Sequence, residues 1–409
     1  MALETAARLG VWTAIVAMSV GAASAQRPAE VAEYGSVGEE LIVFQVDIDR
    51  ATLARQASVM LPGFVQEAWA PSSGPFLYVA WSNGGSSYNG SGVAPRGDQH
   101  GVTAFRVDST GALHLHGAPA SLRSRPIHIT GDGSARHLLV AYNDPSGISV
   151  HMINSDGTVG SEVPQSSSLD VGVYAHQVRV LPSNNAVVLV TRGNEPTSTT
   201  REDPGAVKVF RFDEGKLSNV ASIAPSNGIG FRSRHVDFHP SHSWVFLTLE
   251  AQNRLEVFEQ TNGTLTAAPL FSKATLADGT GVKAGQTAST VHVHPNGQFV
   301  YVANRGAAAG GANNIAAFRI DQRTGEPSLM QNTDTRGLTP RTFSVDPSGR
   351  LLIVGNQTTR SVADKADKTV PANLAAFRIR SDGTLEFAQR YDLAVGQKPL
   401  WWTGLVPLH

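Results

Sequence analysis

Five ionisable side chains stand at the ends of short β-rich segments, where they could act together on one substrate. They are His176 in YAHQVRVLP, Arg234 in RSRHVDFHP, Glu250 in FLTLEAQN, Arg305 in YVANRG and Arg341 in TPRTFSVDP. A histidine or a carboxylate can activate water as a general base. Guanidinium groups can stabilise a developing oxyanion or hold a carboxylate or phosphate of the substrate. The set therefore has the chemistry that is needed to open a lactone.

The same residue types also allow other roles. Either His176 or Glu250 could be the base, and the residues alone do not decide between them. Arg and Glu side chains at strand ends also form ion pairs between neighbouring elements without any catalytic role. His239 and His294 stand in His-Pro turns at the opposite end of their segments, and we expect them to be structural.

A sequence repeat indicates how these residues could be brought together. Seven segments share an aliphatic run, an anchor residue and a turn that contains Asp, Asn or Gly, as in VTAFRVDSTGAL and LAAFRIRSDGTL. The anchors recur at intervals of about 46 to 61 residues, at Phe44, Phe105, His151, Phe210, Phe258, Phe318 and Phe377. Between copies lies a second hairpin, such as VHVHPNGQFVYVAN. Two hairpins per copy make four antiparallel strands, and seven copies predict an all-β, seven-bladed β-propeller.

The two ends of the repeat array predict how the ring closes. The chain ends in KPLWWTGLVPL, which fits an inner strand without a second strand after it. The first copy is preceded by only a short candidate strand, 31–36. We therefore expect the last blade to be closed by both termini, because this arrangement pairs strand edges that would otherwise be exposed.

Loop lengths indicate which face of the propeller carries the site. The turns within each hairpin are tight, whereas several connections at the other end are long: 82–101, 192–206, 272–287, 305–314 and 357–372. Long loops in a compact domain are usually functional. We expect the ionisable set to meet at the channel mouth on that face, with the Glu250 carboxylate within reach of Arg234.

The N-terminus and the composition limit the function classes. Residues 1–25 contain a short apolar run followed by Ala23-Ser24-Ala25, which is typical of a cleaved signal peptide, and residues 26–409 are expected to form a single domain. We expect a periplasmic or secreted monomer with no membrane span after cleavage. The chain has no cysteine, so it has no disulfide or thiolate site, and its net charge of -1 gives no reason to expect nucleic-acid binding.

Several strings carry a resemblance to a known family. SRHVDFHP, HVHPNGQFVYVANRG and TPRTFSVDPSGRLLIVGNQ are similar to the repeat consensus of the seven-bladed lactonase family, which includes bacterial 6-phosphogluconolactonases and fungal carboxy-muconate lactonising enzymes. The resemblance implies that no metal or organic cofactor is needed. It implies these catalytic residues: His176, Arg234, Glu250 and Arg305. The residues of the same strings that we expect to contact the substrate are Arg341, His235, Asn304 and Asn356.

These observations favour a lactonase-like hydrolase that opens a sugar lactone or a related hydroxy-acid lactone. Its partner would be a small-molecule lactone or acidic sugar. Two alternatives stay open: a non-catalytic exported propeller that binds a ligand or protein on its loop-rich face, and a muconate-type cycloisomerase. The Ala/Gly-rich stretch after Arg305 departs from the family pattern and leaves the substrate open.

Overall fold

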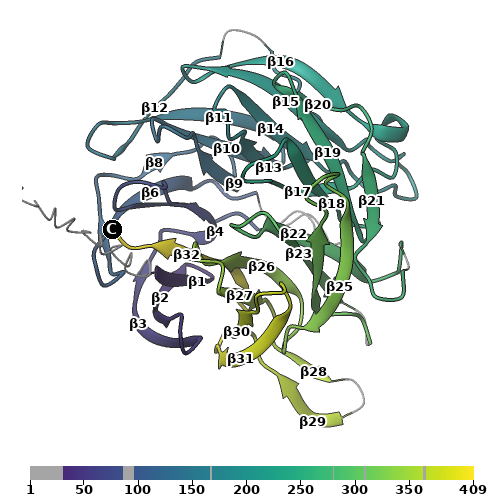
Figure 1. Cartoon of the computed structure of the whole chain (residues 1–409). Helices are drawn as coiled ribbons and strands as arrows, with labels where there is room; N and C mark the ends of the chain where they lie inside the picture. The colour runs from purple at the N-terminus through teal and green to yellow at the C-terminus, as the bar shows by residue number, and fades with distance from the viewer. Residues whose placement is uncertain (1–30, 86–95, 166–167, 280, 308–309, 363–364) are drawn as a thin grey trace, which may run out of the picture.

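The computed structural model describes residues 31–85, 96–165, 168–279, 281–307, 310–362 and 365–409, without the side chains of 361–368. Within these residues, seven sheets of four or five strands are arranged as blades around one axis (Figure 1), and a two-stranded hairpin is added to one of them. The predicted all-β, seven-bladed propeller with four antiparallel strands per blade is therefore confirmed. We number the blades in chain order.

The strands of each blade follow from the innermost to the outermost. Blade 1 consists of β32 (Leu400–Pro407), β1 (Val31–Val37), β2 (Glu40–Asp47) and β3 (Thr52–Met60). Blade 2 consists of β4 (Phe64–Trp69), β5 (Phe76–Ser82), β6 (His100–Val107) and the outer pair β7 (Leu113–Leu115) and β8 (Ala120–Ser121). Blade 3 consists of β9 (Pro126–Gly131), β10 (His137–Asn143), β11 (Ser146–Ile153) and β12 (Val159–Glu162). Blade 4 consists of β13 (Ala175–Val180), β14 (Ala186–Thr191), β15 (Ala206–Asp213) and β16 (Lys216–Ile223).

The remaining blades have the same order. Blade 5 consists of β17 (Ser233–Phe238), β18 (Trp244–Leu249), β19 (Arg254–Thr261) and the outer pair β20 (Thr264–Leu265) and β21 (Phe271–Ala274). Blade 6 consists of β22 (Gln286–Val293), β23 (Phe299–Gly306), β24 (Asn314–Ile320) and β25 (Pro327–Asp334). Blade 7 consists of β26 (Pro340–Val345), β27 (Leu351–Asn356), β30 (Asn373–Ile379) and β31 (Leu385–Asp392), with the inserted hairpin β28 (Arg360–Val362) and β29 (Lys365–Val370). A 3₁₀ turn, η1 (Pro225–Gly228), connects blades 4 and 5.

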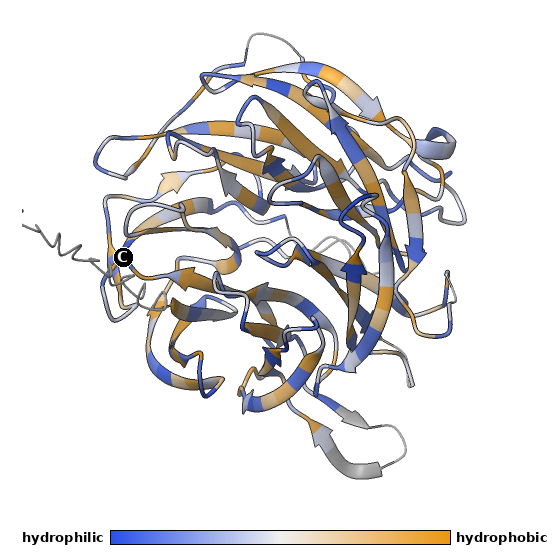
Figure 2. Ribbon diagram, viewed as in Figure 1, coloured by the Kyte–Doolittle hydropathy of each residue, from blue (hydrophilic) through white to orange (hydrophobic). Residues whose placement is uncertain are grey.

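Apolar side chains fill the space between neighbouring blades. Strand interiors are hydrophobic and turns are hydrophilic (Figure 2), as expected for sheets that are covered on both faces. Val257 of blade 5 packs in one cluster with Val302 and Phe318 of blade 6, and all three are fully buried. Because each blade buries one face against each neighbour, no blade can complete its core alone.

Equivalent polar contacts connect several pairs of neighbouring blades. The hydroxyl groups of Tyr34, Tyr78 and Tyr301 donate hydrogen bonds to glycine carbonyls in the outer turn of the next blade, at 2.6, 2.8 and 3.0 Å. His239 and His294 lie opposite Gly297 and Gly349 of the next blade in the same way, with Nε2 2.8 Å from the carbonyl oxygen. These two histidines therefore connect turns of adjacent blades, as expected for structural residues.

The ring is closed by strands from the two ends of the described chain. β32 pairs antiparallel with β1 from Val31–Pro407 to Val37–Leu400 (Figure 1, yellow beside purple). The Trp402 N–H donates to Ser36 Oγ at 2.9 Å, and Thr403 Oγ1 donates to a carboxylate oxygen of Glu33. The predicted closure of the last blade by both termini is confirmed. The expected signal peptide at 1–25 lies outside the described residues.

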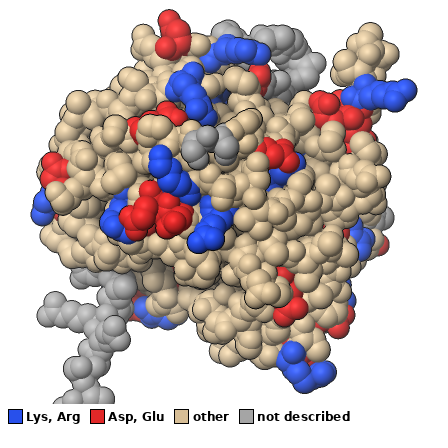
Figure 3. Space-filling model, turned by 90° about the horizontal axis from the view of Figure 1, so that it is seen from above, with Lys and Arg blue, Asp and Glu red and all other residues tan. Residues whose placement is uncertain are grey.

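The long connections leave the second strands on one face. They follow β5, β14, β23 and β27, whereas the turns between inner and second strands lie at the other end. In the view of Figure 3, acidic side chains lie beside basic ones, and most of the surface consists of uncharged residues. This mixture agrees with the net charge of -1. Among the described residues, no helix is long and apolar enough to cross a membrane.

The closing blade should respond to pH through Glu33, which is fully buried between β1 and β32. Burial raises the pKa of Glu33 to about 8. Between these two pH values the folded protein keeps the proton on Glu33, whereas the unfolded chain has released it. The free energy of unfolding is therefore highest below pH 4.5 and falls as the pH rises to about 8. Glu33→Gln should remove this loss and be more stable than the wild type at pH 8.5 by several kcal/mol, at about 1.4 kcal/mol for each pKa unit.

Urea unfolding at pH 5 and pH 8.5 measures this difference. Glu214→Gln is the control, because Glu214 is largely exposed in a turn of blade 4. An equal change of stability with pH in wild type and Glu33→Gln would contradict the prediction.

Candidate functional site

One additional residue in each inner strand determines what faces the channel. His176 shows the pattern: Ala175 pairs with Thr191 and Gln177 with Val190, so that His176 has no partner on β14. Such a β-bulge bends the strand and turns side chains to a new direction. The inner strands of all seven described blades have such a register shift, and its first unpaired residue is Gln66, Ile127, His176, Arg234, Ser289, Arg341 or Trp401. After Arg234, Ser289 and Trp401 the following residue is unpaired as well.

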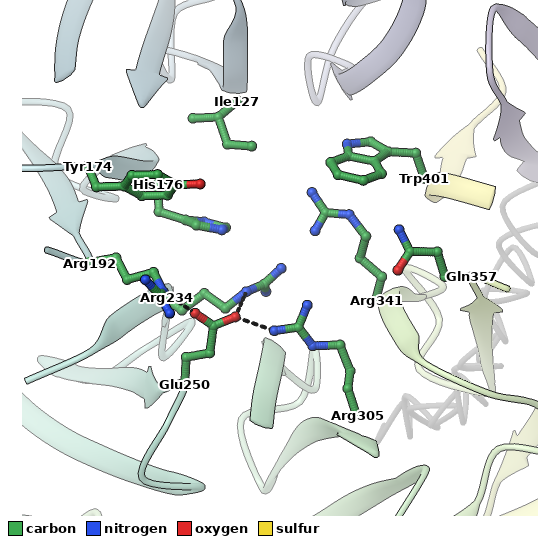
Figure 4. Close-up of a pocket in the computed structure, with 10 residues that line it drawn as sticks. All are labelled: Ile127, Tyr174, His176, Arg192, Arg234, Glu250, Arg305, Arg341, Gln357 and Trp401. Atoms are coloured by element: carbon green, nitrogen blue, oxygen red, sulfur yellow. Dashed lines mark hydrogen bonds and ion pairs between the residues drawn. The ribbon is translucent and has the colours of Figure 1, made fainter. Parts of the chain in front are cut away.

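Five of these bulge residues line a cavity of about 120 Å³ at the mouth of the channel, on the face of the long connections. The rest of the lining comes from residues just before an inner strand or at the end of a second strand and just after it. We call this space the mouth cavity (Figure 4), and its lining residues are Ile127, Tyr174, His176, Arg192, Arg234, Glu250, Arg305, Arg341, Gln357 and Trp401. Blades 1, 3, 4, 5, 6 and 7 all contribute to it.

The residues that follow each bulge line a second and deeper space. Glu67, His128, Gln177, His235, Thr290, Thr342 and Trp402 come next to the bulge position in the seven inner strands, and all of them line a cavity of about 280 Å³. The bulge therefore makes two successive rings of side chains along the axis. Five of the seven residues of the first ring line the mouth cavity, and all seven of the second ring line the deeper channel.

Glu250 is the centre of the mouth cavity. Its carboxylate forms ion pairs with Arg192 and Arg305, and its Oε1 lies 3.4 Å from Nε of Arg234. These guanidinium groups come from blades 4, 6 and 5, so that one carboxylate connects three blades. The expected proximity of Glu250 and Arg234 is what the structure shows.

The structure brings five of the predicted residues together and places three elsewhere. His176, Arg234, Glu250, Arg305 and Arg341 all line the mouth cavity. The other three expected substrate contacts, His235, Asn304 and Asn356, do not line this cavity.

Asn304 and Asn356 are fully buried in the blades and do not line the mouth cavity. The Asn304 side chain bonds with Thr275 and Asn314, and that of Asn356 with Thr335 and Asn373. Each stands one residue before a mouth residue, Arg305 or Gln357. Because successive side chains of a strand point to opposite faces, both amides turn into the blade.

His235 belongs to the second ring and lines the deeper channel. Its ring centroid is 5.2 Å from that of His176 and 6.1 Å from that of His128. Its ring therefore packs against His176 on the side of the deeper channel. Direct contact with a ligand in the mouth cavity is not supported by this position.

Sequence reasoning missed half of the cavity lining, and Arg192 most of all. Arg192 follows the last residue of β14 as Glu250 follows β18, and the strings TRG at 191–193 and NRG at 304–306 are parallel. That parallel was the available signal. Ile127 and Trp401 could be found only once the bulge positions were known, and Tyr174 and Gln357 only once the bounds of β13 and β27 were known.

Burial and neighbouring charges set the protonation states. Burial alone would raise the pKa of Glu250, but the guanidinium groups of Arg192, Arg305 and Arg234 outweigh it and hold the pKa well below its usual range. Burial, together with the charge of Arg234, lowers the pKa of His176 well below 6.5. At neutral pH the cavity therefore contains an ionised Glu250 and an uncharged His176 imidazole.

The cavity has more cations than anions and more free donors than acceptors. Among the described residues, its lining contains the guanidinium groups of Arg192, Arg234, Arg305 and Arg341 against the carboxylate of Glu250. Nη1 and Nη2 of Arg234, which is 1% exposed, have no hydrogen-bond partner in the described structure. Unpartnered buried donors are costly, so this arrangement is suited to a ligand that supplies oxygen acceptors.

The residue set gives no indication of a metal centre. In the part of the chain that the structure describes, no group of three or more His, Asp or Glu side chains is placed to bind a metal ion. The chain also lacks cysteine.

Comparison with known proteins identifies similar chains. The family described as "Lactonase, 7-bladed beta-propeller" matches residues 34–364. A 6-phosphogluconolactonase of Yersinia pestis (strain Pestoides F) is 26% identical over 368 residues, which cover 89% of this chain and 94% of the relative. A 6-phosphogluconolactonase of Bacillus subtilis (strain 168) is 27% identical over 271 residues, which cover 64% of this chain and 72% of the relative.

Solved structures agree with the fold. A protein from Lactobacillus plantarum superposes with a TM-score of 0.68 at 20% identity, covering 93% of this chain and 100% of that one. The structure titled as a periplasmic gluconolactonase of Pseudomonas aeruginosa has a TM-score of 0.65 at 20% identity, covering 93% and 99%. At this identity the similarity shows the fold alone.

Glu250 should stabilise the protein as well as order the cavity. Glu250→Gln keeps the shape of the side chain but removes the carboxylate charge beside the buried guanidinium groups of Arg192 and Arg234 and the partly buried one of Arg305. Removing one partner of a buried ion pair costs about 3 to 5 kcal/mol, so the free energy of unfolding should fall by that order.

Urea unfolding checks this, with Glu195→Gln as the matched control. Glu195 also forms an ion pair with Arg192, at 2.9 Å, but its side chain is 56% exposed, so its removal should cost about 1 kcal/mol or less. Equal losses in the two variants would show that Glu250 has no special structural role.

Proposed function

The chain belongs to the lactonase, seven-bladed β-propeller family, and we propose that it is a lactonase-like hydrolase that opens a sugar lactone or a related hydroxy-acid lactone. Relatives named 6-phosphogluconolactonase over most of the chain favour this activity over a non-catalytic propeller or a cycloisomerase. The observation that carries the proposal is an uncharged imidazole, His176, in the same cavity as the unpartnered guanidinium donors of Arg234.

His176 is the proposed general base. A base must be free of its proton at the working pH, and burial keeps His176 uncharged at pH 7. Its Nδ1 has no hydrogen-bond partner in the described structure. Glu250 is a weaker candidate, because its carboxylate is already shared by guanidinium groups of three blades.

In the proposed reaction, water attacks the carbonyl carbon of the lactone while His176 accepts a proton from the water. The carbonyl oxygen becomes an oxyanion, which the N–H groups of Arg234 and Arg305 stabilise. The bond between the carbonyl carbon and the ring oxygen then breaks, and His176 returns the proton to the departing oxygen. The product is the open hydroxy acid, and the reaction consumes the lactone and one water.

Each remaining residue has a proposed task in this scheme. Glu250 positions the guanidinium groups of Arg192, Arg234 and Arg305, and its negative charge offsets their mutual repulsion. Arg341 lies across the cavity from His176 (Figure 4), where it can hold a polar substituent of the substrate. The proposed partner is a small-molecule lactone or acidic sugar bound by a monomer.

Replacing His176 should abolish most of the activity. In a panel of lactones followed with a pH indicator, His176→Ala should lower kcat by roughly a hundredfold or more, which is the usual contribution of a general base. His242→Ala is the control, because His242 is exposed in the turn at the opposite face. The wild-type kcat/KM should stay constant from about pH 8 down to pH 6.5, since the pKa of His176 lies below 6.5.

Two outcomes would contradict this assignment. Unchanged turnover in His176→Ala would mean that the base is another group. An acid limb centred at or above pH 6.5 would mean that the essential group is not a buried imidazole with a lowered pKa.

We propose further that the protein is exported to the periplasm or secreted. The support is the apolar run before Ala23-Ser24-Ala25 and the similar fold of a protein described as periplasmic. Mass spectrometry of the natively produced protein should find an N-terminus at or near Gln26. An intact Met1 on protein from the cytoplasmic fraction would contradict cleavage and export.

A further inference from the structure

Arg125 is a buried cation beside the mouth cavity that the proposed reaction does not use. It precedes the inner strand β9 of blade 3 and is 5% exposed. Its Nε and Nη1 atoms have no hydrogen-bond partner in the described structure. Burial lowers the pKa of Arg125 to about 10, which still leaves the guanidinium group charged at pH 7.

Trp401 connects Arg125 to the cavity. The guanidinium carbon of Arg341 lies 3.8 Å from the centroid of the Trp401 ring, and that of Arg125 lies 5.7 Å from it. Trp401 Nε1 and Arg341 Nε are also buried without a hydrogen-bond partner in the described structure. We call Arg125, Arg341 and Trp401 the Trp401 patch.

Every unpartnered polar atom of the Trp401 patch is a donor, and two of its three members are cations. Interaction with an aromatic ring stabilises a cation but leaves its N–H groups unsatisfied. The Glu67 carboxyl beside Arg341 does not supply the missing charge, because burial raises the pKa of Glu67 to about 8 and keeps it mostly protonated at pH 7. The patch therefore lacks an anion.

The patch is separate from the atoms that would react. Figure 4 shows Trp401 and Arg341 on one side of the mouth cavity, across from His176 and Arg192. Glu250 forms its ion pairs on the other side, with guanidinium groups of blades 4, 5 and 6. A substrate whose carbonyl lies near His176 would thus place its far end at the patch.

We propose that Arg125, with Arg341 and the indole N–H of Trp401, binds an anionic substituent of the lactone at the end remote from the reacting carbonyl. The substrate class is a lactone that carries a carboxylate or a phosphate, and Arg125 selects it over a neutral lactone of the same ring. This inference rests on the proposed function, since it names the substrate class of that site. Guanidinium groups suit either anion, because both accept paired hydrogen bonds.

Steady-state kinetics with three related lactones test the proposal. Glucono-1,5-lactone is neutral, its 6-phosphate carries a phosphate, and the corresponding lactone of glucaric acid carries a carboxylate at C6. In phosphate-free buffer, Arg125→Gln should lower kcat/KM at least about tenfold for a charged lactone, chiefly through KM, and leave the neutral lactone unchanged. Loss for the phosphate alone or the carboxylate alone identifies the anion.

Two further variants separate recognition from folding. Trp401→Phe keeps an aromatic ring but removes the N–H donor, so it should lower kcat/KM more for the charged lactone than for the neutral one, and for the charged lactone by a smaller factor than Arg125→Gln does. Arg50→Gln removes an equal charge from an exposed turn between β2 and β3 and should change neither. Equal losses on charged and neutral lactones in Arg125→Gln, or no loss at all, would overturn the proposal.

A binding measurement separates failure of this proposal from failure of the proposed function. If the wild type opens none of the three lactones, the hydrolase is contradicted, and calorimetric titration with glucarate, 6-phosphogluconate and gluconate decides the inference. Tighter binding of glucarate or 6-phosphogluconate than of gluconate by the wild type, lost in Arg125→Gln, would support the anion site. Equal binding of all three acids by the wild type, or equal affinities in the two proteins, would overturn it.

Discussion

The inner strand of every described blade has one residue more than its neighbour can pair, and the function of the channel depends on this mismatch. A regular strand would alternate its side chains between the two faces of the blade, and both faces are buried against neighbouring blades. The bulge breaks this alternation at the level of the mouth. It allows His176, Arg234 and Arg341 to leave the packed sheet and face a common space. Polar chemistry can thus exist at the centre of an apolar ring.

The bulges also bring several guanidinium groups close together, and the Glu250 carboxylate lies among them. Guanidinium groups that converge in a low-dielectric space repel one another. Glu250 compensates three of them, and since each belongs to a different blade, the ion pairs also set the spacing of blades 4, 5 and 6. The same ion pairs consequently determine both the arrangement of the site residues and the packing of these blades. Arg125 and Arg341 lie beyond this compensation and are held beside an indole ring instead.

The repeat made the architecture predictable from sequence. Anchors such as Phe318 and Phe377 mark the third strands, and the tight turns show how each blade folds back on itself, so the number of blades and the face of the long loops followed directly. Residues at strand ends were harder to place. Asn304 and Arg305 are adjacent and both polar, yet one turns into the blade and the other into the cavity. Sequence patterns do not show at which residue a bulge shifts the alternation of side chains between the two faces. They also do not show that Trp401 of blade 1 and Arg125, which precedes β9 of blade 3, lie side by side.

The order in which the chain is synthesised gives the closing strand a further meaning. Trp402 bonds to Ser36 across 366 positions of sequence, and Trp401 beside it forms part of the mouth cavity. Until β32 is synthesised, blade 1 has only β1, β2 and β3. During that time the mouth cavity lacks a wall and β1 has an unpaired edge. The mouth cavity therefore forms only in a full-length chain. A chain that stops before β32 contains nearly every residue of the site but cannot complete its wall.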